Sequence, residues 1–344
     1  MKNNKWKKIN RVLDRIFGFL LVTVIAIGVA GLGAEYVCVK GPSKSLSNTF
    51  VKTMNETRRF TFINHIFLTD AEYAEIADFN ALKDYASTNT AVYDDSLVTI
   101  SDKKTDENGV DAYGLRDDDG DGIIFEKVKY KGSTGYMLVI LDPTRVFVGM
   151  PEVFGGNGLQ LEDMVNKYGA IGGINAGGFI DDGGAGTGGF PDGITIVDGV
   201  CYNDFCNGAT VGLTAEGKMY VGYYSYQECV DLGLVNAVSF YPVIIINGEK
   251  VDPSTLESGI NPRTCIGQRA DGAIIMLVVD GRQAYSIGVT YEDCADIMLS
   301  YGVVNAINMD GGSSSCMMYN GELVNHPTNA AGGTRYLPTS WLFK

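Results

Sequence analysis

Apolar residues in this chain fall mostly into short runs separated by polar turns, a pattern typical of a strand-rich protein. Three of these runs end abruptly in a polar residue beside glycines, and the polar residues are Asn175, Asp280 and Asp310. Uninterrupted apolar runs predict buried strands. Glycine lets a ligand approach the main chain closely, so a polar residue at such a strand end predicts a site built on a rigid edge.

Helical signals lie between the strands. Residues 161–168 are predicted to form a helix, and residues 294–301 form another, which Thr290 caps with Asp293 at the capping-box position. The chain also has 44 glycines, well above the usual share of about 7%. Without a collagen-like period, these glycines indicate turns and site loops.

The N-terminal pattern is different. Residues 16–39 are almost wholly apolar, about the length of a membrane-spanning helix, and they follow a basic segment at residues 1–15. The positive-inside rule then predicts a single-pass protein of the cell membrane, with a cytoplasmic N-terminus and an extracytoplasmic catalytic domain. A cleaved signal peptide is the alternative, but its apolar core is normally only about 7–15 residues. We therefore favour a signal anchor.

Residues 40–110 have the mixed composition of a helical stalk or collar. Residues 47–66 are predicted to be helical, and Thr69 with Glu72 three residues later indicates another helix start. We interpret this segment as a spacer that lifts the catalytic domain, residues 111–344, away from the membrane.

Charge and cysteine content exclude two classes of function. The formal net charge of the 344 residues is -14, which argues against nucleic acid as a partner. There are only two histidines and no Cys-x-x-Cys pair, so a common zinc site is not expected and no cofactor is required. Cys201 and Cys206 lie in one loop, where they can form a bridge.

One acidic turn resembles the first half of a calcium loop. Asp117, Asp119 and Asp121 occupy alternate positions before a glycine, as oxygen ligands of calcium do. The second half departs from the EF-hand, because Val128 stands where a bidentate glutamate is expected. A structural calcium ion and a bare acidic turn are the two interpretations.

Three arginines, Arg263, Arg282 and Arg335, occupy polar loops comparable to the three strand ends. If these loops cluster, carboxylates can act as acid, base or nucleophile at an anomeric carbon. Arginines and turn amides can hold a departing phosphate. For each residue taken alone, a turn or a structural ion pair is the alternative.

The motifs together resemble the phosphodiester glycosidase family over residues 130–344. The resemblance implies an α+β fold with a mixed β-sheet core flanked by helices, and a hydrolase that cleaves a glycosyl–phosphate bond. It places Asp310, Asp280, Arg263 and Asn175 at the catalytic core, lined by Arg282, Gly311, Gly312 and Ser313. We predict that these lining residues bind the substrate together with Ser314, Gly178 and Arg335. The four motifs that carry it occur in order at Asn175–Phe179, Asn261–Gly267, Val279–Arg282 and Asn308–Ser314.

The expected function is therefore that of an extracytoplasmic hydrolase of sugar-1-phosphodiesters, with a cell-surface glycan or exopolysaccharide as its substrate. The alternative is a non-catalytic surface protein that binds anionic glycans during envelope assembly, which needs the arginines but not both carboxylates. A polymer-attaching phosphotransferase is a weaker third hypothesis, because the chain shows no basic groove for a lipid pyrophosphate.

Overall fold

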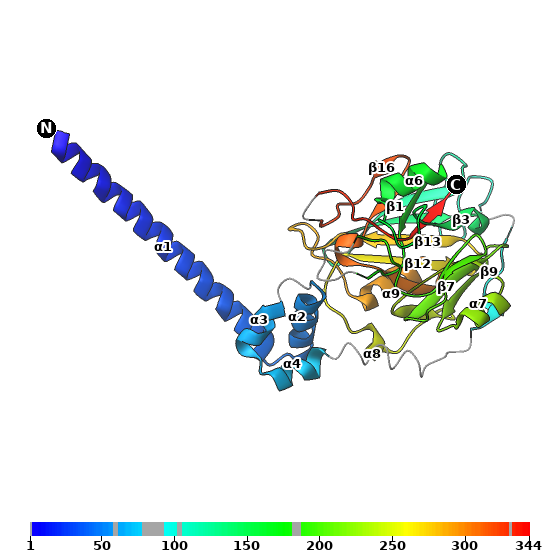
Figure 1. Ribbon diagram of the computed structural model, residues 1–344, viewed down its shortest axis with the longest axis horizontal. Helices are drawn as coiled ribbons and strands as arrows, with labels where there is room; N and C mark the ends of the chain where they lie inside the picture. Colours follow the sequence, from blue (N-terminus) through cyan, green and yellow to red (C-terminus); the bar gives the residue numbers. More distant parts are fainter. Residues whose placement is uncertain (1, 58–60, 78–92, 102–104, 181–186, 330–331) are drawn as a thin grey trace.

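Three β-sheets with helices packed against them form the globular part of the molecule (Figure 1). The computed structural model describes residues 2–57, 61–77, 93–101, 105–180, 187–329 and 332–344. A long helix and a small helical collar precede the sheets. The predicted α+β class, with sheets flanked by helices behind an apolar N-terminal helix, is confirmed.

The largest sheet has seven strands in the order β1-β2-β13-β12-β14-β10-β11. Each neighbouring pair in it is antiparallel. The bounds are β1 (Ile123–Tyr130), β2 (Ser133–Ile140), β13 (Ile274–Val279), β12 (Arg263–Arg269), β14 (Val303–Met309), β10 (Val243–Ile246) and β11 (Glu249–Lys250).

Two five-stranded sheets complete the β-structure, and their neighbouring strands are also antiparallel. The first has the order β16 (Glu322–Leu323), β15 (Met317–Tyr319), β4 (Gly172–Asn175), β17 (Ser340–Phe343) and β3 (Val146–Gly149). The second has the order β6 (Val200–Asn203), β5 (Thr195–Val197), β9 (Leu234–Phe240), β7 (Ala209–Thr214) and β8 (Met219–Gly222).

The helices lie at the N-terminus and around the sheets. They are α1 (Lys2–Lys40), α2 (Lys44–Glu56), α3 (Thr61–Phe67), α4 (Asp70–Ala77), α6 (Leu161–Tyr168), α7 (Tyr226–Asp231), α8 (Pro253–Leu256) and α9 (Tyr291–Ser300). The predicted helix at residues 161–168 is confirmed, and Thr290 caps α9 in a reciprocal capping box with Asp293.

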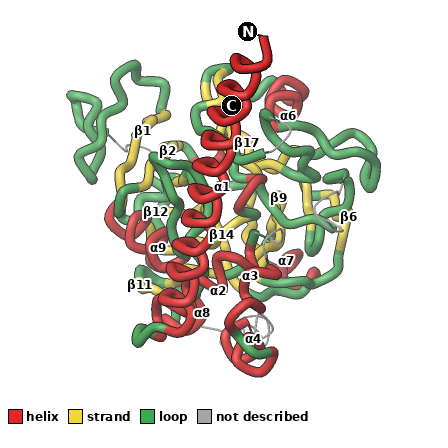
Figure 2. The backbone as a smooth tube through the Cα atoms, turned by 90° about the vertical axis from the view of Figure 1, so that its left-hand side faces the viewer, coloured by secondary structure: helices red, strands yellow, loops and turns green. Residues whose placement is uncertain are grey.

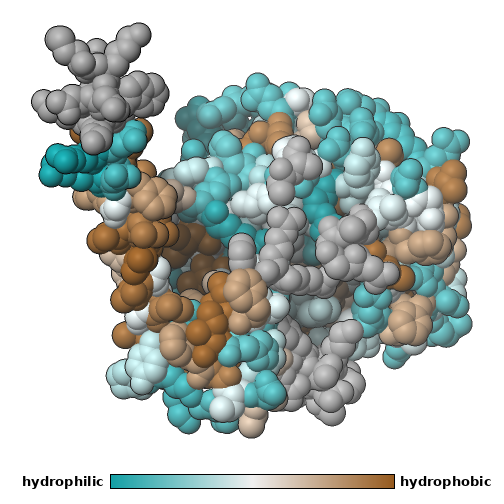
Figure 3. Space-filling model, turned by 60° about the vertical axis from the view of Figure 1, so that its left-hand side comes forward, coloured by the Kyte–Doolittle hydropathy of each residue, from teal (hydrophilic) through white to brown (hydrophobic). Residues whose placement is uncertain are grey.

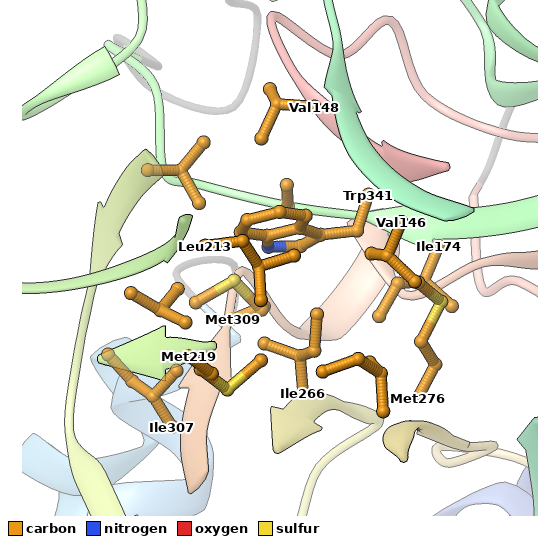
Figure 4. Packing of buried hydrophobic residues seen from close by; sticks show 14 of the residues in the cluster. Val146, Val148, Ile174, Leu213, Met219, Ile266, Met276, Ile307, Met309 and Trp341 are labelled. Carbon is orange, nitrogen blue, oxygen red and sulfur yellow. The ribbon is translucent and has the colours of Figure 1, made fainter. Parts of the chain in front are cut away.

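Both faces of the seven-stranded sheet are buried at its centre, which explains why β13 is apolar along its whole length. Along β2, Leu138 faces one core, while Met137 and Val139 face the other. The first core joins the three sheets around the fully buried Trp341 (Figure 4). The second core is closed by the apolar face of α9. Burial from both sides holds the strand ends in fixed positions.

Helix α1 is the one long apolar helix among the described residues. Within residues 10–40, the most apolar window has a mean hydropathy of 2.5, so the helix is long and apolar enough to cross a membrane. None of this window is buried against the rest of the molecule. Figure 3 shows apolar surface along this helix. The same properties fit a signal sequence, so topology and location remain proposals.

The collar consists of α2, α3 and α4 around a small core of Val39, Val51 and Leu68. The single helix expected at residues 47–66 is instead two, because α2 ends at Glu56 and α3 begins at Thr61. The predicted helix start is confirmed, since Thr69 Oγ1 accepts the Glu72 amide at 3.3 Å. Residues 58–60, 78–92 and 102–104 of the predicted stalk lie outside the described part.

Cys201 and Cys206, which lie close enough in sequence to form a bridge, are both free thiols. The Cys206 sulfur instead donates to the carbonyl oxygen of Tyr224, 2.9 Å away. Burial is the first cause that raises the pKa of both thiols, and nearby carboxylates, Asp204 and Glu228, add to it.

Candidate active site

The two predicted carboxylates meet at one edge of the seven-stranded sheet. Arg263, the first residue of β12, pairs with Val279, the last residue of β13. The following residue of β12 pairs with the last residue of β14. Because β12 lies between β13 and β14, Asp280 and Asp310 flank the beginning of β12. The structure thus brings together strand ends that are 30 residues apart in sequence, as the pattern predicts.

Asn175 joins the second sheet to this edge. Its side-chain Nδ2 donates to the carbonyl oxygen of Asp310 at 2.5 Å. Its Oδ1 accepts from Thr264 Oγ1 at 2.8 Å and from the Cys316 amide at 3.1 Å. The Asn175 side chain is completely buried, so in this structure it braces the Asp310 turn rather than facing a substrate.

The two carboxylate turns pack on a common segment. A Cβ atom on Gly281 would lie 2.5 Å from the Pro262 nitrogen, so there is no room for a side chain. On the other side, the Gly312 amide donates to the Pro262 carbonyl oxygen at 2.9 Å. The segment around Pro262 therefore sets the distance between the Asp280 turn and the Asp310 turn.

Asp280 is buried, with 1% of its surface exposed, and it holds a histidine. Its Oδ1 accepts from the His326 amide at 2.9 Å and from Asn325 Nδ2 at 3.1 Å. Its Oδ2 lies 3.3 Å from His326 Nδ1, while the His326 side chain is 65% exposed. Tyr285 packs edge-on against the imidazole, with ring centres 5.9 Å apart. A buried carboxylate thus orients an imidazole that solvent and substrate can reach.

The charge of the Asp280 carboxylate also affects the pKa of Tyr136 on β2. Burial, and secondarily the negative charge of Asp280, raise the pKa of Tyr136 to about 12. The same two causes raise the pKa of Tyr285. Both phenols are therefore neutral at ordinary pH.

Arg282 is exposed and adopts the left-handed backbone conformation, with φ of 57°. Its Nε and Nη2 both donate to Asn261 Oδ1, at 3.0 and 2.8 Å. A Cβ atom on Gly312 would lie 3.3 Å from Arg282 Nη2, so the guanidinium group lies directly against the Asp310 turn. Among the predicted arginines, this one has the position and exposure to hold an anion beside that turn.

The Asp310 turn is itself partly open. Residues 310–313, which include the predicted Gly311 and Ser313, are intermediate in exposure, whereas Ser314 is buried. The Gly312 amide is engaged by Pro262, and the Ser314 amide donates to the Gly311 carbonyl oxygen at 3.1 Å. These two amides are already used within the turn, which leaves Arg282 as the stronger candidate for phosphate.

Arg263 has surroundings unlike those of a substrate ligand. Its side chain is only 4% exposed and stacks on Tyr291, 4.0 Å from the ring centre. Its Nη2 contacts Glu56 Oε2 at 2.7 Å and the Gly259 carbonyl oxygen at 2.6 Å, and its Nε donates to the Val289 carbonyl oxygen. The geometry gives Arg263 a supporting place under the site, and a direct catalytic role for it stays a prediction.

Gly178 lies in the turn that follows Asn175, and Arg335 packs against the same turn. A Cβ atom on Gly178 would lie 2.8 Å from the Phe240 ring, so glycine is required there for close packing. The Arg335 guanidinium stacks on Phe179, 4.9 Å from the ring centre. Their predicted roles in substrate binding remain predictions.

Three further residues of this site, which the sequence motifs do not include, are Glu56, Asn325 and His326. His326 is the only histidine in residues 111–344, which is a usable signal because histidine is the side chain best suited to proton transfer near neutral pH. Glu56 belongs to the predicted stalk, and no local pattern links it to Arg263.

The acidic turn lies in another part of the globular region. Asp117, Asp119 and Asp121 each place one carboxylate oxygen within 4.8 Å of the others. Burial, followed by the charges of Asp119 and Asp117, raises the pKa of Asp121. Asp117 also accepts the amides of Gly120 and Gly122. The cluster is compatible with a cation, and calcium there stays a prediction.

Known proteins resemble this chain in sequence. A sequence model of the phosphodiester glycosidase family matches residues 168–344. The SPbeta prophage-derived uncharacterized protein YomE of Bacillus subtilis is 29% identical over an alignment of 200 residues, and the match covers 54% of this chain and 29% of that protein. Bovine N-acetylglucosamine-1-phosphodiester alpha-N-acetylglucosaminidase is 32% identical over an alignment of 139 residues, and the match covers 35% of this chain and 26% of that enzyme. The chain thus spans less than a third of the length of these relatives.

The fold is also shared with solved structures. The catalytic domain of the zebrafish N-acetylglucosamine-1-phosphodiester alpha-N-acetylglucosaminidase, auto-inhibited by its pro-peptide, superposes with a TM-score of 0.55 at 22% identity, covering 64% of this chain and 81% of that one. A hypothetical protein from Synechocystis gives a TM-score of 0.52 at 14% identity, covering 65% and 62%. Because the family model matches just over half of the residues, the chain belongs to the phosphodiester glycosidase family.

Proposed function

We propose that this protein is a hydrolase that cleaves the glycosyl–phosphate bond of sugar-1-phosphodiesters. One observation carries the proposal: the turn with Asp280 and Arg282 lies beside the Asp310 turn at one sheet edge, where Asp280 holds an exposed His326. An anion-binding arginine, a carboxylate and an oriented imidazole are the groups that this hydrolysis needs. Membership of the family supports the same reaction class.

In the proposed reaction, the bond between the anomeric carbon and the phosphate oxygen breaks, and the phosphomonoester leaves with the bonding electron pair. A water oxygen forms the new bond to the anomeric carbon, and its proton passes to a base. The products are the free sugar and the phosphomonoester. Because the departing phosphate is already a stable anion, it needs charge stabilisation more than protonation, and Arg282 is placed to provide this.

The two acidic turns take different roles in this mechanism. Asp310, which is partly exposed, stabilises the positive charge that develops on the sugar in the transition state. His326 accepts the proton from water, and buried Asp280 fixes the tautomer and orientation of the imidazole. Asn175 and Arg263 act through the backbone of the turns that they support.

The N-terminal region suggests where the reaction takes place. We propose that α1 is a signal anchor, that residues 1–15 are cytoplasmic, and that the sheets lie outside the membrane. The length and apolar character of α1 and its basic flank support this arrangement. A sugar-phosphate glycan of the cell envelope, such as an exopolysaccharide, would then be within reach of the site.

An assay of the 344-residue chain in detergent tests the proposal. We expect release of free sugar from an N-acetylglucosamine-1-phosphodiester or another sugar-1-phosphodiester, and loss of most turnover in Asp310→Asn. Glu162→Gln, an exposed change on α6, serves as the control and should keep parent activity. If no sugar-1-phosphodiester is turned over but anionic glycans bind, the protein is a glycan-binding surface protein instead.

A further inference from the structure

Helix α2 of the collar lies beside the globular part of the molecule (Figures 1 and 2) and contacts the segment that precedes β12. A Cβ atom on Gly259 would lie 2.4 Å from the Thr53 backbone, so the two main chains touch. The Ile260 amide donates to Thr53 Oγ1 at 2.9 Å, and Lys52 pairs with Glu257 at 2.6 Å. The collar is thus a docked element and not only a spacer.

The last residue of α2, Glu56, holds this segment at three points. Its Oε1 accepts the Gly259 amide at 2.8 Å. Its Oε2 accepts from Asn261 Nδ2 and from Arg263 Nη2, both at 2.7 Å. The Glu56 side chain is 13% exposed and that of Arg263 is 4% exposed, so the pair is largely shielded from water.

The contact with Glu56 decides how Asn261 meets Arg282. A carboxylate can only accept hydrogen bonds, so Asn261 must present its NH₂ group to Glu56. Its carbonyl oxygen then points the other way and accepts both bonds from the Arg282 guanidinium. The chain of contacts therefore runs from α2 through Asn261 to the arginine beside Gly312.

Loss of the Glu56 charge would disturb this chain in two ways. Arg263 would remain as a buried cation without its carboxylate partner, which is strongly unfavourable. Asn261 would also lose the contact that fixes its amide, and Arg282 would lose its aligned acceptor. Small displacements of this kind cost catalysis disproportionately, by up to about 100-fold for a shift of about 1 Å.

We propose that Glu56 is a positioning residue of the active site, and that the membrane-proximal collar must be docked for turnover. The proposal rests on the proposed function, since it assigns Arg282 to the phosphate of the substrate. Glu56 acts through Asn261 and Arg263, not by touching the substrate. It makes the membrane-proximal helix a part of the catalytic unit.

The 344-residue chain in detergent provides the test, with Glu56→Gln compared with Lys52→Gln. Both changes remove one ion pair between α2 and the globular part, but Lys52 pairs with a Glu257 side chain that is 54% exposed. For Glu56→Gln we expect a fall in kcat/KM of roughly tenfold or more. For Lys52→Gln we expect a change within about twofold.

Backbone amide exchange gives a readout that does not depend on catalysis. In Glu56→Gln, exchange should accelerate in residues 259–263 and also in residues 281–283, because the Asn261 contact transmits the change. A merely local role would confine faster exchange to residues 259–263 and would leave kcat/KM within about twofold of the parent. That combination would overturn the proposal.

A paired substitution separates positioning from stability. Glu56→Met combined with Arg263→Met removes both charges at similar volume, so the melting temperature should return close to that of the parent. The turnover should remain low, because Asn261 still lacks its acceptor. Recovery of parent turnover in this double variant would refute the positioning role. If the parent chain itself has no turnover, the proposed function fails. The amide-exchange comparison would still show whether Glu56 is coupled to residues 281–283.

Discussion

Asp280 and His326 are joined at two points, through the backbone and through the side chains. The His326 amide donates to Asp280 Oδ1 at 2.9 Å, while His326 Nδ1 lies 3.3 Å from Asp280 Oδ2. The double contact fixes the imidazole plane and directs Nε2 away from the carboxylate. Since Asp280 directly follows β13, a strand that is buried on both faces, the sheet fixes this orientation.

Replacement of His326 by glutamine should reduce turnover strongly and leave the fold intact. We expect a loss of about 10²–10⁴-fold in kcat, the usual contribution of a positioned acid or base. The melting temperature should change little because the side chain is 65% exposed. His65→Gln is a matched control, since His65 also faces a carboxylate, Asp70, at 3.4 Å, but lies in the collar. Equal effects of the two changes would contradict the assignment.

Replacement of Arg282 by lysine should weaken substrate binding although the charge is kept. Lysine lacks the planar fork that now gives two bonds to Asn261, so the cation is no longer fixed beside Gly312. Loss of one charge-assisted hydrogen bond corresponds to roughly 10- to 100-fold in kcat/KM. Steady-state kinetics measure this, with Arg116→Lys at an exposed ion pair as the control. Parent kinetics in Arg282→Lys would remove Arg282 from the site.

Asn175→Ala should destabilise the protein and not only inactivate it. Three buried partners, the Asp310 carbonyl oxygen, the Thr264 hydroxyl and the Cys316 amide, would lose their hydrogen bonds. Such losses cost about 1–3 kcal/mol each, and chemical denaturation would measure the sum. Asn166→Ala on the exposed surface of α6 should stay within about 0.5 kcal/mol of the parent. A parent-like stability of Asn175→Ala would exclude the bracing role.

The sequence was sufficient to find the strand ends because each is a local pattern. Apolar runs that stop at Asp280 and Asp310 indicate where buried strands end, and these ends meet because β12 pairs with both β13 and β14. The α+β class and the capping box at Thr290 follow from equally local signals. The sequence therefore predicts the place of a residue in the fold wherever that place is determined by its neighbours in the same strand or turn.

Long-range packing set the roles that the sequence did not reveal. Arg263 looks like a phosphate ligand in a polar loop, yet α2 covers it and supplies Glu56, 207 residues earlier in the chain. Similarly, His326 follows a two-residue strand, β16, with no apolar pattern to mark it. The burial of these two residues and the identity of their hydrogen-bond partners depend on how the collar and the sheets pack together. Hydrophobic periodicity does not predict that packing.

Alkaline pH should destabilise the fold in part through Tyr136. Burial and the charge of Asp280 raise its folded-state pKa to about 12, above the ordinary value of 10.0. The contribution of Tyr136 to the free energy of unfolding is therefore fully present below pH 10. It is lost as the pH rises toward about 12, because the unfolded chain loses the phenol proton first. The free energy of unfolding, measured by chemical denaturation across this pH range, should fall less steeply with pH in Tyr136→Phe than in the parent. An identical pH dependence would show that Tyr136 is not coupled to unfolding.

Calcium should stabilise the chain through the turn at residues 117–121. Three carboxylates within 4.8 Å repel one another. Burial and the neighbouring charges raise the pKa of Asp121, and a bound cation would offset this repulsion. We expect millimolar calcium to raise the melting temperature, a chelator to reverse the increase, and Asp121→Asn to abolish it. Asp118→Asn is the matched control, because Asp118 lies in the same turn but pairs with Arg116 outside the cluster. The same response to calcium in Asp121→Asn as in Asp118→Asn would identify the turn as a bare acidic loop.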